Sequence, residues 1–389
     1  MTRKSMKPVA FAAVAIGALA LSACSGGGDS GSGGEASGGE IVVGVALPTT
    51  GGSAVLGEPM SHGIEMAVNE INEAGGINGA TVRIVQEDTG ADDATALNAF
   101  NRITSEDPAA VIGFPVSTQG FAVMTQVDRA GIPVIMGGTN AKLATASDWA
   151  FGMTSHDGIT TTAATQFAVE ELGVTKIALL RESGELGTGA SEVVHEAADE
   201  FGFEVVDEEI FQSGDVDLST QANTLRGSDA EMLFIYGQQA DYIVAANALA
   251  TAGVKLPSFV AGVQPGTYDQ LNYDGFDTIY NRNQCVPSAA TEGALFDWSA
   301  AYEEEWGTAP TEYAAIAYDG ANLLFDAIEA AGSTDAEAVQ QALLELPEST
   351  GICGVHSGSE SGQLSFSATI GHYEDGAYVT DESIDVAAP

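Results

Sequence analysis

Two short polar segments carry the residue types that bind a small anion, and each directly follows an apolar run. Ser117 precedes a helical pattern, so its hydroxyl lies beside the backbone N–H groups that the start of a helix leaves without partners. Gly137, Gly138 and Thr139 follow the next apolar run, where glycine lets the backbone approach a ligand and Thr139 adds a second hydroxyl. Together these groups are able to hold one carboxylate without a basic residue. The same residues also suit an ordinary helix cap and an ordinary turn. Their positions in the fold must therefore distinguish a binding site from these structural roles.

The apolar pattern places both segments at the ends of strands. Strand-like runs alternate with helix-like runs from Ile41 onward, and Pro59 is predicted to open the first helix. The predicted strands span 41–47, 82–86, 109–113, 133–136, 176–181, 203–209, 232–236 and 258–261. The predicted helices lie between them, and the alternation restarts after about residue 156. This order predicts two parallel sheets with helices on both faces, and ligands of such sheets bind outside the carboxyl ends of the strands.

Composition excludes several classes of function. The 389 residues include 12 Lys and Arg against 55 Asp and Glu, which gives a formal net charge of −43 and excludes binding to a nucleic-acid backbone. The chain has no G-x-S-x-G, H-E-x-x-H or G-x-x-x-x-G-K-[ST] motif, its five histidines are scattered, and no loop has calcium-binding spacing. We therefore expect no catalytic residue, no metal and no cofactor. An acidic surface of this kind keeps a protein soluble and is suited to an environment of high ionic strength.

The N-terminus predicts where the protein is located. Three basic residues precede an uncharged apolar run, 9–21, which is too short to span a bilayer and ends at the small residues before Cys24. This pattern resembles the bacterial lipobox, in which the cysteine becomes the lipidated first residue of the mature chain. Residues 25–40 are rich in glycine and serine and predict a flexible tether. We expect an extracytoplasmic protein that a lipid on Cys24 anchors to the bacterial cell membrane.

Two further cysteines, Cys285 and Cys353, remain in the predicted mature chain. An even number of cysteines in an oxidising compartment indicates a disulfide, which here would close a loop of roughly 70 residues.

Several sequence motifs resemble one family. They include GVALPTTG at 44–51, GIEMAVNEIN at 63–72, GGING at 75–79, VIG at 111–113 before Ser117, GIPVI at 131–135 and DVDL at 215–218, with Tyr313 and the pair Tyr318-Asp319 further on. This set is similar to the leucine/isoleucine/valine-type solute-binding proteins of ABC importers. The match extends over nearly all of the predicted mature chain.

The resemblance implies a type I periplasmic-binding-protein fold, in which two doubly wound parallel-sheet lobes are joined by three crossings. We place the crossings near residues 155, 285 and 363. Lobe one then comprises 41–155 and 286–362, and lobe two comprises 156–285 and 363–389, after a signal peptide at 1–23 and a tether at 24–40. The implied partners are a small solute, an ABC permease and its ATPase subunits, and we expect a monomer.

The resemblance also assigns a pocket. It implies that Ser117 and Thr139 bind the α-carboxylate of the ligand and that Gly137 contributes its backbone amide and carbonyl. Tyr313 matches a pocket aromatic. Leu56 and Leu186 stand where branched-chain binders carry tyrosines, and Gln239 stands at a third such position.

One loop departs from the amino-acid pattern. Where branched-chain binders use an acid to hold the α-ammonium, residues 262–265 read GVQP and contain no carboxylate. Because an unpaired ammonium in a closed cleft is costly, a carboxylic acid without an amine, an amide or a urea-like solute is an alternative ligand, with Gln239 and Gln264 as amide-type partners. Two other functions share this scaffold: a ligand-sensing receptor ectodomain, which the sequence does not separate from a transport protein, and an extracellular hydrolase, which the missing motifs disfavour.

Overall fold

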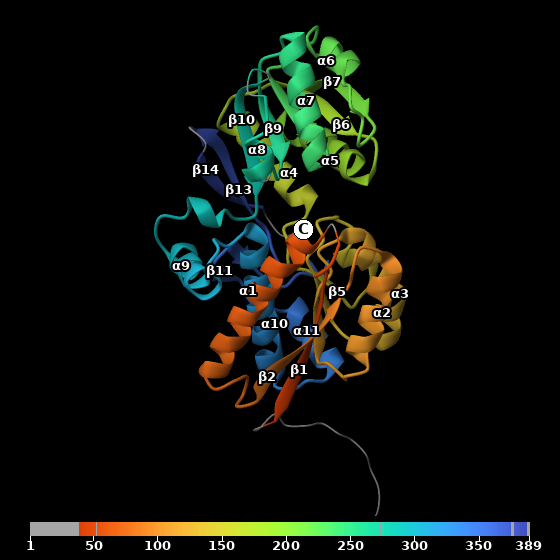
Figure 1. The fold of residues 1–389 in the computed structure, drawn as a ribbon, viewed down its shortest axis with the longest axis vertical. Coiled ribbons are helices and arrows are strands. Elements are labelled where there is room, and N and C mark those ends of the chain that lie inside the picture. Colours follow the sequence, from red (N-terminus) through yellow and green to blue (C-terminus); the bar gives the residue numbers. More distant parts are fainter. Residues whose placement is uncertain are drawn as a thin grey trace, which may run out of the picture. The chain divides into compact units, whose positions relative to one another are not determined.

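The computed structural model describes residues 39–386, apart from 52, 264, 273, 275 and 375–376. The predicted signal peptide, Cys24 and Gln264 lie outside the described residues. Two large sheets organise the described chain (Figure 1).

The first sheet has the strand order β2-β1-β3-β4-β5, and all its pairs are parallel. Its strands are β1 Glu40–Leu47, β2 Thr81–Asp88, β3 Ala110–Gly113, β4 Val134–Met136 and β5 Ala150–Gly152. The helices of this lobe are α1 Ala54–Glu73, α2 Asp93–Thr104, α3 Ser117–Ala130, α10 Glu312–Ala331 and α11 Ala336–Leu344. The order is that of a doubly wound sheet, which confirms the fold class predicted from the alternation of elements.

Both faces of the first sheet are covered. Apolar residues of α2 and α3 pack with one set of strand residues, and those of α1, α10 and α11 pack with the alternate set (Figure 1). Near-continuous apolar strands such as β1 follow from this, because a parallel sheet between two helical layers buries both faces of each strand. The helices cover the two faces of the sheet and not the carboxyl ends of β3 and β4. A ligand is therefore expected at these strand ends.

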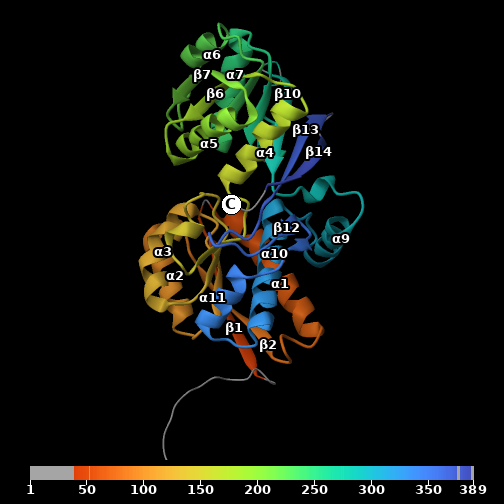
Figure 2. The ribbon, with the colours of Figure 1, turned by 180° about the vertical axis from the view of Figure 1, so that it is seen from behind.

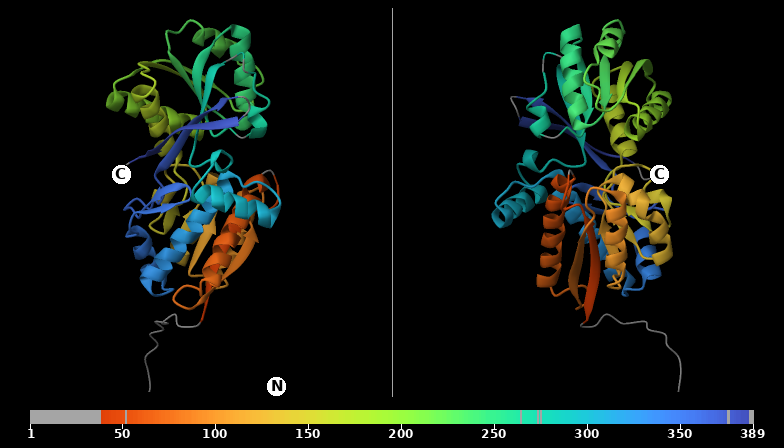
Figure 3. Two further views of the ribbon diagram at one scale, coloured as in Figure 1. Left: turned by 90° about the vertical axis from the view of Figure 1, so that its left-hand side faces the viewer. Right: turned by 45° about the vertical axis from the view of Figure 1, so that its right-hand side comes forward.

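The second sheet repeats the same winding. Its order is β14-β13-β10-β9-β8-β6-β7, in which β7-β6-β8-β9-β10 are parallel neighbours and β13 and β14 add an antiparallel pair beside β10 (Figure 3). The strands are β6 Lys176–Glu182, β7 Glu204–Phe211, β8 Met232–Tyr236, β9 Leu256–Ala261, β10 Phe276–Asn283, β13 Ser367–Glu374 and β14 Ala377–Asp385. Its helices are α4 Asp157–Glu170, α5 Glu185–Phe201, α6 Ser219–Leu225, α7 Gln239–Ala252 and the short α8 Pro265–Tyr268. Helices α6 and α7 cover the face seen in Figure 1, and α4 and α5 cover the face seen in Figure 2.

The remaining elements of the described residues are α9 Ala294–Trp306, the short 3-10 helices Ala144–Ala146 and Pro287–Ala289, and a small antiparallel pair, β11 Ser349–Gly351 with β12 Gly354–His356. Cys285 and Cys353 form a disulfide, as the cysteine count predicts, and both residues are buried. The bridge joins the segment that follows β10 to the turn between β11 and β12.

The prediction that Pro59 opens the first helix is wrong, because α1 begins at Ala54 and contains Pro59. Proline removes one backbone hydrogen bond inside a helix, so propensity favours a start at that residue. The preceding turn is held by tertiary packing instead: Gly57 is buried, and a Cβ at this position would lie 2.0 Å from the carbonyl oxygen of Pro48.

Polar side chains tie together the segments that run between the lobes. The amide of Ser155 donates to Gln284 Oε1 at 2.8 Å, and Gln363 Nε2 donates to the carbonyl of Thr154 at 2.8 Å. Thr369 Oγ1 donates to the carbonyl of Gln284 at 3.1 Å. Residues 154–155, residue 284 and residues 363–369, which are remote in sequence, are thus connected by hydrogen bonds.

Within the described ranges, no helix has the length and apolar character needed to cross a membrane. The same residues hold no group of three or more His, Cys, Asp and Glu side chains placed to bind a metal ion.

Candidate functional site

A cavity of about 620 Å³ lies between residues of the two sheets. The lobe-one wall comes from the start of α1, the loops after β3 and β4, and the start of α10. The lobe-two wall comes from the ends of β6, β8, β9 and β10 and from the starts of α4, α5 and α7. We call this cavity the cleft. A second concavity, of about 400 Å³, is lined by Tyr268, residues 276–280, residues 372–374 and Asp381, all of one lobe.

Ser117 and Thr139 both line the cleft. Ser117 is the first residue of α3, as predicted, and the chain reaches it through a sharp turn in which Gly113 has φ 146° and Phe114 has φ 49°. The hydroxyl of Ser117 accepts a hydrogen bond from the amide of Asn140 at 3.3 Å, so the two predicted polar segments are in contact.

The two glycines before Thr139 have a packing role. Gly138 and Gly137 are buried and do not line the cleft. A Cβ on Gly138 would lie 2.8 Å from Ser117 Oγ, so glycine is required for the loops to meet. The expectation that Gly137 offers its amide to a ligand is wrong, because that amide donates to the carbonyl of Gly113 at 2.8 Å. Its carbonyl accepts from Thr154 Oγ1 at 3.0 Å.

The other predicted pocket residues come from both lobes. Leu56 of α1 and Tyr313 of α10 line the cleft from lobe one, and Leu186 of α5 and Gln239 of α7 line it from lobe two. Burial raises the pKa of the Tyr313 phenol, so that side chain is neutral at ordinary pH. Gln239 Nε2 donates to the carbonyl of Gly262 at 3.0 Å.

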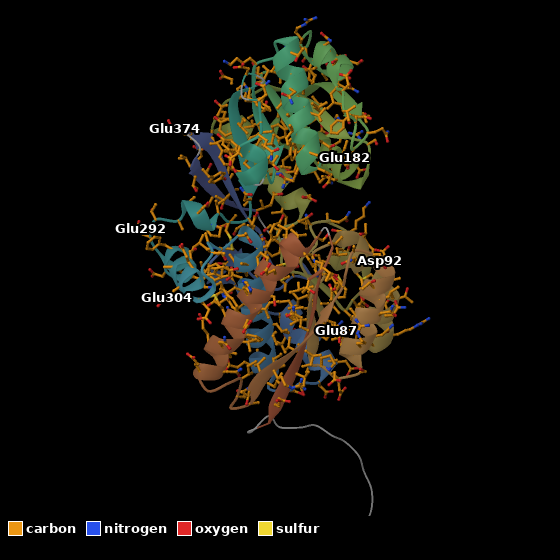
Figure 4. All side chains as sticks on the ribbon, in the orientation of Figure 1. Glu87, Asp92, Glu182, Glu292, Glu304 and Glu374 are labelled. Atoms are coloured by element: carbon orange, nitrogen blue, oxygen red, sulfur yellow. A yellow bond between two sulfur atoms is a disulfide. The ribbon has the colours of Figure 1, made fainter. Side chains whose placement is uncertain are left out.

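Four ionisable side chains in the cleft were not predicted: Asp157, Glu182, Arg282 and Glu312. Glu182 and Glu312 accept hydrogen bonds from backbone amides, and Asp157 lies beside Arg282. Both oxygens of Glu182, which lies beside α5 (Figure 4), accept backbone N–H groups at the start of that helix, from Gly184 at 2.9 Å and Gly187 at 3.1 Å. Asp157 Oδ1 lies 3.5 Å from Arg282.

Glu312 faces the segment that follows β10. Its carboxyl accepts the backbone amide of Gln284 at 2.5 Å and also that of Cys285. Burial raises the pKa of Glu312 to about 7, against the opposing effect of these two amides and of Arg282. Near neutral pH this carboxyl therefore carries only part of a negative charge.

Comparison with known proteins identifies the family. The family model described as periplasmic binding protein matches residues 40–377 of this sequence. The chain belongs to the periplasmic binding protein family. It is 24% identical over 324 residues to Leu/Ile/Val-binding protein homolog 1 of Brucella abortus (strain 2308), an alignment that covers 83% of this chain and 87% of that one.

Solved structures of similar proteins share the fold. The substrate-binding protein LivJ of a branched-chain amino acid transporter from Streptococcus pneumoniae, in complex with isoleucine, superimposes with a TM-score of 0.73 at 22% identity. A solute-binding protein of an ABC transporter from Rhodopseudomonas palustris BisB5, in complex with 3,4-dihydroxybenzoic acid, gives a TM-score of 0.72 at 18% identity. Both comparisons cover 89% of this chain, and 99% and 97% of the other. The type I periplasmic-binding-protein fold is thereby confirmed.

Two of the four ionisable cleft residues of this periplasmic binding protein had a signal in the sequence. Glu182 ends β6, and Arg282 lies at the end of β10, so the rule that ligands bind at the carboxyl ends of strands also selects these positions. The sequence predicts anion-binding residues only at strand ends of lobe one, and it predicts no strand at β10. Glu312 and Asp157 carried no such signal, because two acids among 55 at helix starts are unremarkable in sequence.

Proposed function

We propose that this protein is the extracytoplasmic solute-binding component of an ABC importer and that it captures a small carboxylate, amino acid or amide between its lobes. The supporting observation is the cleft itself, in which the Ser117 hydroxyl and Thr139 lie opposite polar side chains of the second sheet. The ligands of the S. pneumoniae and R. palustris structures, isoleucine and 3,4-dihydroxybenzoic acid, differ in the ammonium group and share a carboxylate. The carboxylate is the group common to both ligands, and we propose that Ser117 and Thr139 bind such a group in this protein.

The mechanism that follows is capture by domain closure. A solute that contacts both walls of the cleft stabilises the closed arrangement, and a permease recognises that arrangement. We place the crossings near residues 155, 285 and 363, where the hydrogen bonds of Gln284 and Gln363 connect the segments. No covalent chemistry is required, and we propose a binding protein rather than an enzyme.

We infer the ligand class from the charges that line the cleft. Residues 262 and 263 bear no carboxylate, the carboxylates of Glu182 and Glu312 accept backbone amides, and the negative charge of Asp157 is offset by Arg282 at 3.5 Å. A buried ammonium without a counter-charge is costly. We therefore expect a carboxylic acid without an amine, or an amide, to bind more tightly than leucine, isoleucine or valine.

We further propose that a lipid on Cys24 anchors a monomer to the outer face of the bacterial cell membrane. The supporting observation is the basic, apolar and small-residue order of residues 1–24. Mass spectrometry of the protein purified from membranes tests this: a diacylglycerol-modified Cys24 at the N-terminus supports it, and an unmodified chain that retains residues 1–23 contradicts it.

The decisive experiment is the double variant Ser117→Ala, Thr139→Ala. Each lost hydrogen bond to a charged ligand weakens binding by ~1.5–3 kcal/mol, so the dissociation constant of a carboxylate ligand should rise at least tenfold. Thermal shifts and calorimetry with leucine, isoleucine and 3,4-dihydroxybenzoate measure this. Thr145→Ala, at an exposed threonine outside the cleft, is the matched control. Unchanged affinity in the double variant would remove both residues from the site.

A further inference from the structure

Arg282 lies at the base of the cleft and is only 6% exposed. One terminal nitrogen contacts the hydroxyl of Thr160, and the guanidinium lies 5.8 Å from the centre of the Tyr236 ring. The other terminal nitrogen is 3.5 Å from Asp157 Oδ1, which is long for a hydrogen bond. Among the described residues, neither this nitrogen nor Nε makes a hydrogen bond of ordinary geometry, although the Tyr236 phenol also interacts with the guanidinium. A buried guanidinium with two unsatisfied nitrogens is costly unless another group binds them.

Neighbouring polar groups share this feature. Gln284 and Ser155 also line the cleft, and both residues are buried. In the described part of the chain, Nε2 of Gln284 and Oγ of Ser155 have no hydrogen-bond partner. Guanidinium and amide nitrogens are donors only. The base of the cleft is therefore rich in unsatisfied donors, and the complementary ligand group is an oxygen acceptor.

A continuous set of contacts connects this base to the proposed carboxylate site. Ser117 Oγ accepts from the amide of Asn140, the carbonyl of Thr139 accepts from the amide of Asp157 at 2.9 Å, and Asp157 faces Arg282. A short solute is thus able to contact Ser117 with one end and the Arg282–Asp157 pair with the other. The pair presents a donor and an acceptor side by side.

We propose that Arg282 and Asp157 bind a primary amide group of the solute, with the amide oxygen on Arg282 and the amide NH₂ on Asp157. This proposal rests on the proposed function, since it assigns the second end of the same solute. The solute class is a short carboxylic acid with an amide at its far end. A second carboxylate fits less well, because it would face the Asp157 carboxylate and leave that acceptor without a donor, in a protein of net charge −43.

The test is calorimetry on the purified protein with three acids of five carbons: pentanoate, glutarate and glutaramate. The same set of three is repeated with four-carbon and six-carbon chains. The members of a set differ only in whether the far end is a methyl, a carboxylate or an amide. We expect the amide member to bind at least tenfold more tightly than the other two, because a site that hydrogen-bonds a group discriminates strongly against an analogue that lacks it.

Two variants assign that preference to the pair. Arg282→Met should abolish the amide preference, whereas Arg181→Met, at an arginine paired with Glu208 outside the cleft, should preserve it. Asp157→Asn removes the repulsion and should raise the affinity for glutarate relative to glutaramate at least fivefold. Because Asp157 is at the start of α4 and its side chain is 25% exposed, this variant still reports on the proposal if Arg282→Met does not fold.

The outcomes separate the two proposals. Acids that bind through Ser117 and Thr139 but show no amide preference, or a preference that survives Arg282→Met, overturn the assignment of Arg282 and leave the solute-binding function intact. Solutes of other classes that bind without any effect of Ser117→Ala, Thr139→Ala overturn the proposed carboxylate site. Absence of binding by every acid of the panel overturns the solute class assigned here.

Discussion

The raised pKa of Glu312 makes the pH dependence of stability a direct test of how the cleft is built. The carboxyl has an ordinary pKa of 4.5 in the unfolded chain and about 7 in the folded protein, because burial disfavours its charged form. Between these values the folded state binds more protons than the unfolded state. The contribution of Glu312 to the free energy of unfolding therefore falls as the pH rises through this window and is constant above it. The difference corresponds to about 3 kcal/mol, at ~1.4 kcal/mol for each pKa unit.

Glu312→Gln removes this titration and leaves an oxygen that is able to accept the amide of Gln284. We expect the free energy of unfolding of the variant, relative to that of the parent protein, to be about 2–3 kcal/mol higher at pH 8 than at pH 5. Urea unfolding followed by circular dichroism at both pH values measures the free energies, and the double difference cancels the other titrating acids. Glu337→Gln, at an exposed acid near the start of α11, is the control and should show no such change. The reasoning fails if the two variants have the same difference between pH 5 and pH 8.

Three further predictions concern the framework around the cleft. Asp319→Ala should lower the free energy of unfolding by about 3–5 kcal/mol, because this buried carboxylate accepts the amide of Cys353 at 2.8 Å and pairs with a buried histidine; a loss below about 1 kcal/mol in urea unfolding would contradict this. Gly63→Ala should separate α1 from α10, since a Cβ there would lie 2.0 Å from the carbonyl oxygen of Ala314. Gly189→Ala is the control: a Cβ on this residue of α5 meets no atom within 4 Å, so the change should be neutral or stabilising by up to about 1 kcal/mol. Equal melting temperatures for the two variants would refute the packing argument. Reduction of the disulfide should lower stability by about 4 kcal/mol in the loop-entropy model, and an unchanged urea midpoint would exclude that contribution.

The buried histidine beside Asp319 illustrates what sequence reading leaves out. His356 Nε2 lies 3.0 Å from Asp319, and its Nδ1 lies 2.8 Å from Ser365 Oγ, which itself donates to the carbonyl of Met153 at 2.6 Å. All three side chains are buried, so this line of groups is a structural connection to the segment after β5. Nothing in the spacing of residues 319, 356 and 365 predicts that they meet.

The alternation of apolar runs with helical patterns was sufficient to predict both sheets, most element positions and the carboxyl edge at which Ser117 and Thr139 lie. These features are local, because strand burial and helix amphipathicity are written into consecutive residues. The start of α1 was missed because packing of Gly57 on Pro48 overrides the preference of Pro59 for a first turn.

The amino-acid order alone therefore determined the class of fold, the polar residues at two strand ends and the absence of an acid in residues 262–265. Only the tertiary structure decided which charges share the cleft. It brings Asp157 beside Arg282, which is more than 100 residues away in the sequence, and it places Glu312 in the same cleft. It also decided that the amide of Gly137 is occupied and that Arg282 has donors to offer. The physical reason is that hydrogen-bond satisfaction depends on three-dimensional neighbours, whereas the periodicity of burial depends on the chain itself.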